Sequence, residues 1–102
     1  MFAKGDMTPY ASSFNQPIGD WNVSSVTNMD FMFSDAESFN QPIGNWNVSS
    51  VTNMFRMFRG ASSYNQDISI WSVENVTSCD LFSSNTAQWT LPQPNFTNCN
   101  PD

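Results

Sequence analysis

Histidine is absent from this 102-residue chain, and lysine and arginine together number three against nine aspartates and glutamates, for a net charge of -6. Without histidine there is no ordinary nucleophile–base triad, and no motif has the spacing of a zinc site, an EF-hand loop or a glycine-rich phosphate loop. The acidic balance would repel nucleic-acid phosphates. We therefore expect no enzyme activity, no cofactor, no metal site and no nucleic-acid partner.

A long apolar run is also missing. No stretch approaches the roughly 20 apolar residues that span a bilayer, so no transmembrane segment is expected, and residues 1–7 lack the apolar core of a signal peptide. Aromatic residues nevertheless make up 15% of the chain and charged residues only 12%. Disordered chains do not have this composition. The chain should fold as one domain, although a domain of this size has a thin margin of stability.

The sequence is rich in repetition, with a period of 25 residues. The hexapeptide FNQPIG at residues 14–19 returns at 39–44 and, as YNQDIS, at 64–69. Further columns keep the same offset: Trp21, Trp46 and Trp71; Val23, Val48 and Val73; Val26, Val51 and Val76; Met29, Met54 and Cys79. A constant period of about 20–50 residues is typical of solenoids, in which each unit buries its apolar face against its neighbours.

Within one unit, the spacing of apolar residues predicts a strand followed by helical turns. Trp46 and Val48 alternate as in a strand, whereas residues 54–61 carry apolar side chains three and four apart, with Thr52 placed to cap a helix. Strands are expected at residues 20–23, 45–48 and 70–73. The predicted fold class is α/β: a leucine-rich-repeat-like right-handed solenoid of about four rungs, with short parallel strands on one side and helical turns on the convex side.

The period also divides the single domain. Residues 1–11 form a partial N-terminal repeat, residues 12–36 and 37–61 are full repeats, residues 62–86 form a degenerate repeat, and residues 87–102 form a C-terminal cap. Cys79 occupies a column that holds methionine elsewhere, and Cys99 lies in the cap. A disulfide between them would close a loop of about 20 residues and add roughly 3 kcal/mol of stability. The alternative is two unrelated thiols, with Cys79 buried as a small apolar residue.

The run W-N-V-S-S-V-T-N-M-x-x-M-F-x-x-A-x-x-[FY]-N-Q at residues 46–66 resembles the BspA-like leucine-rich-repeat surface proteins, also catalogued as a domain of unknown function in mycoplasmas, other bacteria and protists. The resemblance covers nearly all of residues 12–83. It implies a surface-exposed, extracellular, binding or adhesive role and no catalytic residues. A disulfide would agree with a cell-surface or extracellular location, or with the lumen of another oxidising compartment.

Two surfaces are candidates for partner binding. The outward positions of the predicted strands form a small polar concave face: Asp20, Asn22, Asn45, Asn47 and Ile70. Residues outside the core columns mark a patch on the convex side: Phe31, Phe55, Arg56, Arg59 and Leu81. Arginine with aromatic side chains is typical of protein interfaces. For both surfaces, simple exposure to solvent is the alternative.

Other repeated residues are expected to be structural. The tryptophan columns share the phase of the valines and should be core rather than a sugar-stacking platform. The column Asn15, Asn40 and Asn65 should satisfy backbone groups at a tight corner. Sequons begin at Asn22, Asn47, Asn75 and Asn95, and Asn95 and Asn75 are glycosylation candidates if the chain passes through a eukaryotic secretory pathway.

Three functions are compatible with this sequence. The favoured one is a non-catalytic protein-interaction module of surface-protein type. The first alternative is a small structural subunit docked in a larger macromolecular assembly, and the second is a glycan-binding or adhesive module. The expected partner is accordingly a protein or a larger assembly, with a glycan as the other candidate.

Overall fold

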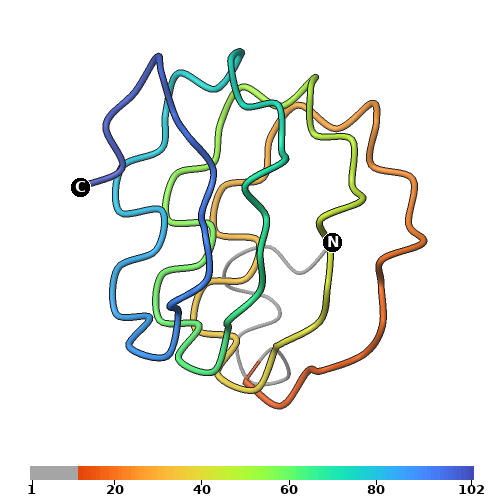
Figure 1. Ribbon diagram of the computed structural model, residues 1–102, viewed down its shortest axis with the longest axis vertical. Coiled ribbons are helices and arrows are strands. Elements are labelled where there is room, and N and C mark those ends of the chain that lie inside the picture. Colours follow the sequence, from red (N-terminus) through yellow and green to blue (C-terminus); the bar gives the residue numbers. More distant parts are fainter. Residues whose placement is uncertain (1–11) are drawn as a thin grey trace.

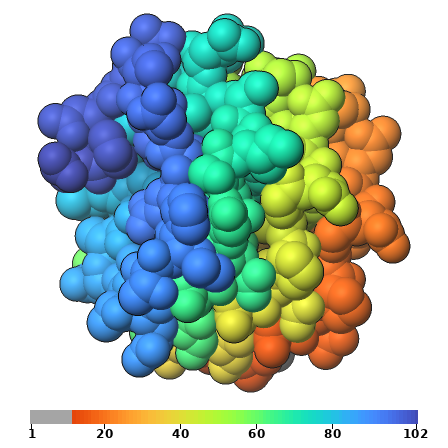
Figure 2. Space-filling model, in the orientation of Figure 1, coloured from red at the N-terminus to blue at the C-terminus, as the bar shows by residue number. Residues whose placement is uncertain are grey.

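The computed structural model describes residues 12–102, and the partial repeat expected at residues 1–11 lies outside them. Consecutive segments of 25 residues run side by side, each making one circuit of the molecule (Figure 1). We call residues 12–36 the first coil, residues 37–61 the second coil and residues 62–86 the third coil. In Figure 2 the front of the molecule is a series of parallel bands, from the orange first coil to the blue C-terminal segment, residues 87–102.

The predicted α/β leucine-rich-repeat-like solenoid is wrong. Residues 12–102 contain no helix, and their only strand-type pairing consists of isolated parallel bridges between Asn28 and Asn53 and between Asn53 and Ser78. The strands expected at residues 20–23, 45–48 and 70–73 do not form, and residues 55–60 form consecutive turns instead of a helix. The molecule is a compact arrangement of turns and loops, without a sheet or a helical convex side in the described part.

Tight turns explain why the spacing of apolar residues wrongly predicted strands. In the second coil, the N–H of Trp46 donates to the carbonyl of Ile43 at 3.1 Å, and the N–H of Val51 donates to the carbonyl of Val48 at 3.0 Å. Hydrogen bonds over three residues are those of β-turns. All four of these residues are buried, because each is the first or last residue of a turn that points it inward. The alternation of buried and exposed residues is therefore real, but turns cause it.

Backbone hydrogen bonds keep neighbouring coils in register along one side. Alternate N–H groups of residues 29–35 donate to alternate carbonyls of residues 53–59 at 2.7–2.9 Å, and residues 54–60 donate in the same way to residues 78–84 at 2.7–3.0 Å. Thr52, which was expected to cap a helix, instead donates its N–H and its hydroxyl to the carbonyl of Thr27. The backbone groups that a helix would satisfy internally are thus satisfied by the next coil.

Asparagine side chains connect the coils at another corner. Oδ1 of Asn15 accepts a hydrogen bond from the N–H of Asn40 at 2.9 Å, and Oδ1 of Asn40 accepts one from the N–H of Asn65 at 2.9 Å. In both cases the amide of the following glutamine donates to the same oxygen at 3.0 Å. The prediction that this column satisfies backbone groups is confirmed.

The core is a set of stacked columns between the two sides of each coil. Trp46 and Trp71 are buried and nearly parallel, with ring centroids 6.4 Å apart, and Nε1 of Trp46 donates to the carbonyl of Ile18 at 3.1 Å. The methionine columns are also buried. Core placement of the tryptophan column is thus confirmed for these two residues. Trp21, in the first coil, is 40% exposed.

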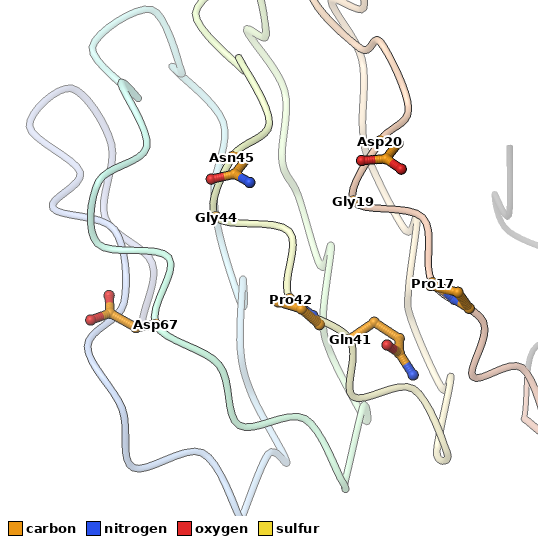
Figure 3. Close-up of a pocket in the computed structure, with 8 residues that line it drawn as sticks. All are labelled: Pro17, Gly19, Asp20, Gln41, Pro42, Gly44, Asn45 and Asp67. Carbon is orange, nitrogen blue, oxygen red and sulfur yellow. The ribbon is translucent and has the colours of Figure 1, made fainter.

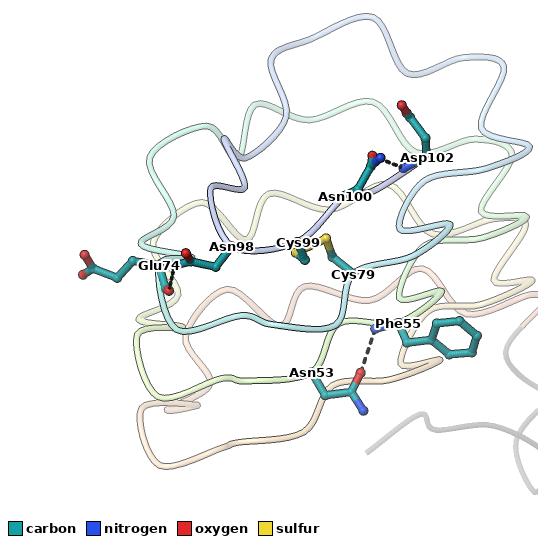
Figure 4. The surroundings of a disulfide bond; sticks show 8 residues. All are labelled: Asn53, Phe55, Glu74, Cys79, Asn98, Cys99, Asn100 and Asp102. Carbon is teal, nitrogen blue, oxygen red and sulfur yellow. Dashed lines mark hydrogen bonds between the residues drawn. A yellow bond between two sulfur atoms is a disulfide. The ribbon is translucent and has the colours of Figure 1, made fainter.

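The C-terminal segment closes one end of the stack. Cys79 and Cys99 form a disulfide with their Cα atoms 5.9 Å apart, which confirms the predicted crosslink over 20 residues (Figure 4). The ring of Phe96 meets Phe82 edge-on at 4.9 Å between centroids. Nδ2 of Asn98 donates to the carbonyl of Glu74 at 2.6 Å. The segment is therefore fixed to the third coil covalently, by apolar packing and by hydrogen bonds.

Candidate docking surfaces

The polar residues expected on a concave sheet face lie on turns instead. Asp20, Asn22, Asn45, Asn47 and Ile70 are all exposed. Oδ1 of Asn22 accepts hydrogen bonds from the N–H and the hydroxyl of Ser24, and Asn47 binds Ser49 in the same way. These two asparagines therefore stabilise turns. Ile70 is 78% exposed on a turn of the third coil.

A shallow groove of about 400 Å³ crosses the coils on this side (Figure 3). Two predicted residues, Asp20 and Asn45, line it together with Pro17, Gly19, Gln41, Pro42, Gly44 and Asp67. A Cβ atom on Gly19 would approach the carbonyl oxygen of Pro42 to 3.0 Å, and one on Gly44 would approach that of Asp67 to 3.2 Å. Glycine thus permits the close approach of the coils at the floor of the groove.

Asp67 was missed by the sequence analysis, although it breaks the column that holds proline at residues 17 and 42. The hydroxyl of Ser69 donates to Oδ1 of Asp67 at 2.7 Å and its N–H donates at 3.0 Å. These bonds lower the pKa of the Asp67 carboxyl below its ordinary value. The Asp67 carboxylate therefore stabilises its own turn. Within residues 12–102, no group of three or more His, Cys, Asp or Glu side chains is placed to hold a metal ion.

The patch predicted on the convex side is partly assembled, although it lies on turns and not on helices. Phe31 and Phe55 meet edge to face with ring centroids 5.4 Å apart. The guanidinium carbon of Arg56 lies 4.9 Å from the Phe55 ring centroid and 5.9 Å from that of Phe31. We call these three half-buried residues the Phe–Arg cluster. Arg59 and Leu81 are also half-buried, but the ring and cation–π contacts within residues 12–102 do not include them.

Two residues of the Phe–Arg cluster, Phe31 and Arg56, have an unusual backbone conformation. Phe31, Arg56 and Leu81 occupy equivalent positions in the three coils and all have positive φ, at 59°, 53° and 58°. The other positive-φ column is filled by residues that tolerate this conformation: Asp35, Gly60 and Asn85. A bulky residue in the left-handed region costs about 1–2 kcal/mol. The apolar or cationic character of these three side chains marks them in the sequence, but nothing in the sequence indicates this backbone conformation.

The guanidinium of Arg56 has few polar contacts. Its Nε atom is buried and has no hydrogen-bond partner. Within residues 12–102, no carboxylate forms an ion pair with Arg56 or Arg59, which are the only lysine or arginine residues in that range. Asp80 is close, since its carbonyl accepts the N–H of Arg56 at 3.0 Å. The arginine thus packs against rings while a neighbouring acidic residue contributes only its backbone.

The first coil exposes part of the core. Trp21 stacks on Trp46 at 6.5 Å between ring centroids, but it is 40% exposed, whereas Trp46 is 4% exposed. Phe14 and Val26 are half-buried, whereas their equivalents in the next two coils are fully buried. A strip of core columns therefore reaches the surface at this end.

Comparison with known proteins assigns the chain at the level of a family. Residues 4–93 match the family model described as "Mycoplasma protein of unknown function, DUF285". The chain belongs to this family. No curated protein and no solved structure matches it. The finer resemblance to BspA-like surface proteins stays a prediction, and the leucine-rich-repeat architecture that it implies is wrong.

The DUF285 chain places its two candidate glycosylation sites differently. Both are exposed, but Nδ2 of Asn75 donates to the carbonyl of Ser49 at 2.8 Å. Glycosylation of Asn75 at Nδ2 would have to accommodate that bond. The described residues also contain no helix of the length and apolarity needed to cross a membrane.

Proposed function

We propose that this DUF285 chain is a non-catalytic protein-interaction module of surface-protein type and that it docks through the Phe–Arg cluster. The observation that carries the proposal is the left-handed column of Phe31, Arg56 and Leu81. Glycine or asparagine would fit this backbone at lower cost, and the chain uses Gly60 and Asn85 in the other such column. Residues held in disfavoured conformations cluster at ligand contacts, which supports a recognition role here.

The composition of the cluster supports the same proposal. Aromatic residues and arginine are enriched in the centres of protein interfaces. Phe55 and Arg56 remain half-buried, so a partner would remove further apolar area from water, and each buried Å² contributes about 25 cal/mol. The disulfide between Cys79 and Cys99 supports a location at the cell surface, outside the cell or in another oxidising compartment.

The test is the native molar mass of the protein drawn gently from its source, measured by light scattering against the 11.5 kDa of the chain. We expect the wild type to travel in a larger complex and the Phe31→Asn/Phe55→Ser variant to run as a monomer. Asparagine is chosen at position 31 because it tolerates a positive φ. Ile70→Ser is the matched control, because it removes an exposed apolar side chain from a different surface and should leave the complex intact. A monomeric wild type, or a complex indifferent to the double substitution, would contradict the proposal.

A second candidate, a small structural subunit of a larger assembly, is favoured by the strip of core at the first coil. Trp21 is 40% exposed there, which is high for a residue of a core column. If Trp21→Ser releases the chain from the complex while the double substitution in the Phe–Arg cluster does not, this second function replaces the first.

A further inference from the structure

We infer that the partner bound by the Phe–Arg cluster is a protein segment that carries a side-chain carboxylate next to an apolar side chain. The carboxylate would bind the Arg56 guanidinium, and the apolar side chain would pack on Phe31 and Phe55. This inference rests on the proposed function, since it names the chemistry of the partner that docks there.

The guanidinium of Arg56 lies over two phenyl rings at 5.9 and 4.9 Å, and contact with ring faces does not use the N–H groups in the guanidinium plane. No carboxylate within residues 12–102 pairs with it. A half-buried cation that pairs with none of the described carboxylates is costly. A carboxylate from outside satisfies this charge, and guanidinium groups bind carboxylates in a two-pronged arrangement.

The distribution of charge on the chain also favours an acidic partner at this cluster. The chain has a net charge of -6, and Arg56 and Arg59 are the only lysine or arginine residues from 12 to 102. An acidic segment is therefore repelled by most of the surface and attracted where these two arginines lie, three residues apart in one run of turns. A basic segment would be repelled at these two arginines.

Apolar surface beside the Arg56 guanidinium favours a protein segment over other carboxylate-bearing ligands. The edge-to-face pair of Phe31 and Phe55 presents apolar ring surface beside the guanidinium. Leu81 continues the column that holds Phe31 and Arg56. Aspartate or glutamate next to leucine or another apolar residue supplies both required groups in one short segment, whereas an acidic glycan supplies carboxylates among hydroxyl groups. The apolar surroundings therefore favour the protein segment.

The test is a titration of the full chain, labelled with ¹⁵N, with a short synthetic peptide that carries two Asp–Leu pairs in a Gly–Ser background. We expect resonance shifts centred on Phe31, Phe55 and Arg56. The counterpart peptide with Asn in place of both Asp residues should bind at least about tenfold more weakly, a difference of about 1.4 kcal/mol. Arg56→Gln should reduce affinity for the acidic peptide to that of its neutral counterpart, and Arg56→Lys, which keeps the charge but loses the planar fork, should fall between them. Ile70→Ser should bind as the wild type does.

Three results would overturn the inference. Equal binding of both peptides at the cluster would mean that the surface docks proteins without reading carboxylates, which leaves the proposed function intact. Binding of an oligogalacturonate at the cluster, with none of the acidic peptide, would assign the carboxylate to a glycan. If the acidic peptide does not bind at concentrations up to roughly 1 mM, which corresponds to a binding free energy of about 4 kcal/mol, the inference is wrong. The native molar mass would still test the proposed function.

Discussion

The two ends of the coil stack differ in how the core is closed. At the C-terminal end, Trp89 and Phe96 pack against Phe82, and a disulfide ties the closing segment to the third coil. At the first coil, Trp21 is 40% exposed, although the equivalent tryptophans are 4% and 5% exposed. The same tryptophan position is therefore enclosed in the second and third coils and partly exposed in the first.

The closed end is made by departures from the repeat. Phe96 stands 25 residues after Trp71, where a further tryptophan would continue the column, and Cys79 stands where the first two coils have methionine. Oδ1 of Asn65 accepts two backbone N–H groups, from Thr90 and Leu91, and so extends the asparagine ladder into the closing segment. Repetition builds the middle of the molecule, and unique residues complete its end.

The largest expected effect contrasts the middle of the tryptophan column, Trp46, with its member in the first coil, Trp21. Trp46→Ala should lower the free energy of unfolding by about 3–5 kcal/mol, because it opens a cavity between two coils. Trp21→Ala should cost only about 1–2 kcal/mol, since part of its surface is already in water. Urea unfolding followed by circular dichroism measures both. Equal losses of stability would mean that Trp21 is as enclosed as Trp46 in solution, which would contradict the contrast between the first and second coils.

The second prediction concerns removal of the disulfide that ties the C-terminal segment to the third coil. The Cys79→Met/Cys99→Ser variant removes the crosslink but restores the methionine found at positions 29 and 54, so the core column stays filled. Stability should fall by about 3 kcal/mol, because a loop of about 20 residues is no longer closed in the unfolded chain. The urea midpoint measures this loss. The reduced wild type should match the variant, and an unchanged midpoint in both would refute a stabilising crosslink.

The packing of the core could be predicted from the sequence better than the backbone that supports it. The 25-residue columns predicted the buried tryptophans, valines and methionines, although Trp21 is 40% exposed. Cys79 in a core column and Cys99 in the cap favoured the disulfide over two unrelated thiols. Helix and strand were wrong because inward residues at spacings of two, three and four also arise from consecutive β-turns. Residues 55–60 satisfy their N–H groups partly between coils, and the spacing of side chains does not distinguish that from a helix.

The candidate site was predictable by side-chain type and not by geometry. Phe31, Phe55 and Arg56 were identified because they lie outside the core columns, and the structure brings them into contact. Positive φ at Phe31 and Arg56 was not predictable, because these residue types disfavour it. The groove was missed because it depends on how closely Gly19 and Gly44 let the coils approach.

The third prediction compares the asparagine ladder at its two ends. Asn65→Ala should lower stability by about 2 kcal/mol, because two backbone N–H groups of the closing segment lose their acceptor. Asn15→Ala should cost about 1 kcal/mol, since only one backbone N–H, that of Asn40, depends on it and the other donor is the side chain of Gln41. Hydrogen exchange should also become faster at Thr90 and Leu91 in the first variant alone. Similar losses in both variants would show that the ladder contributes equally at the two ends.

The smallest expected effect uses Tyr64 as a reporter of closure at the C-terminal end. Trp89 meets its ring edge-on at 4.8 Å between centroids, Phe39 stacks on it at 5.5 Å, and this burial raises the pKa of the Tyr64 hydroxyl above its ordinary value of about 10. Because the folded chain keeps the proton that the unfolded chain releases, the contribution is complete below about pH 10 and is lost as the pH rises above it. Stability should therefore be about 1.4 kcal/mol lower at one pH unit above that value. Tyr64→Phe, which restores the residue of the first two coils, should abolish this loss. The same loss of stability at high pH in Tyr64→Phe would show that Tyr64 is not its source and that Trp89 does not shield this hydroxyl from water.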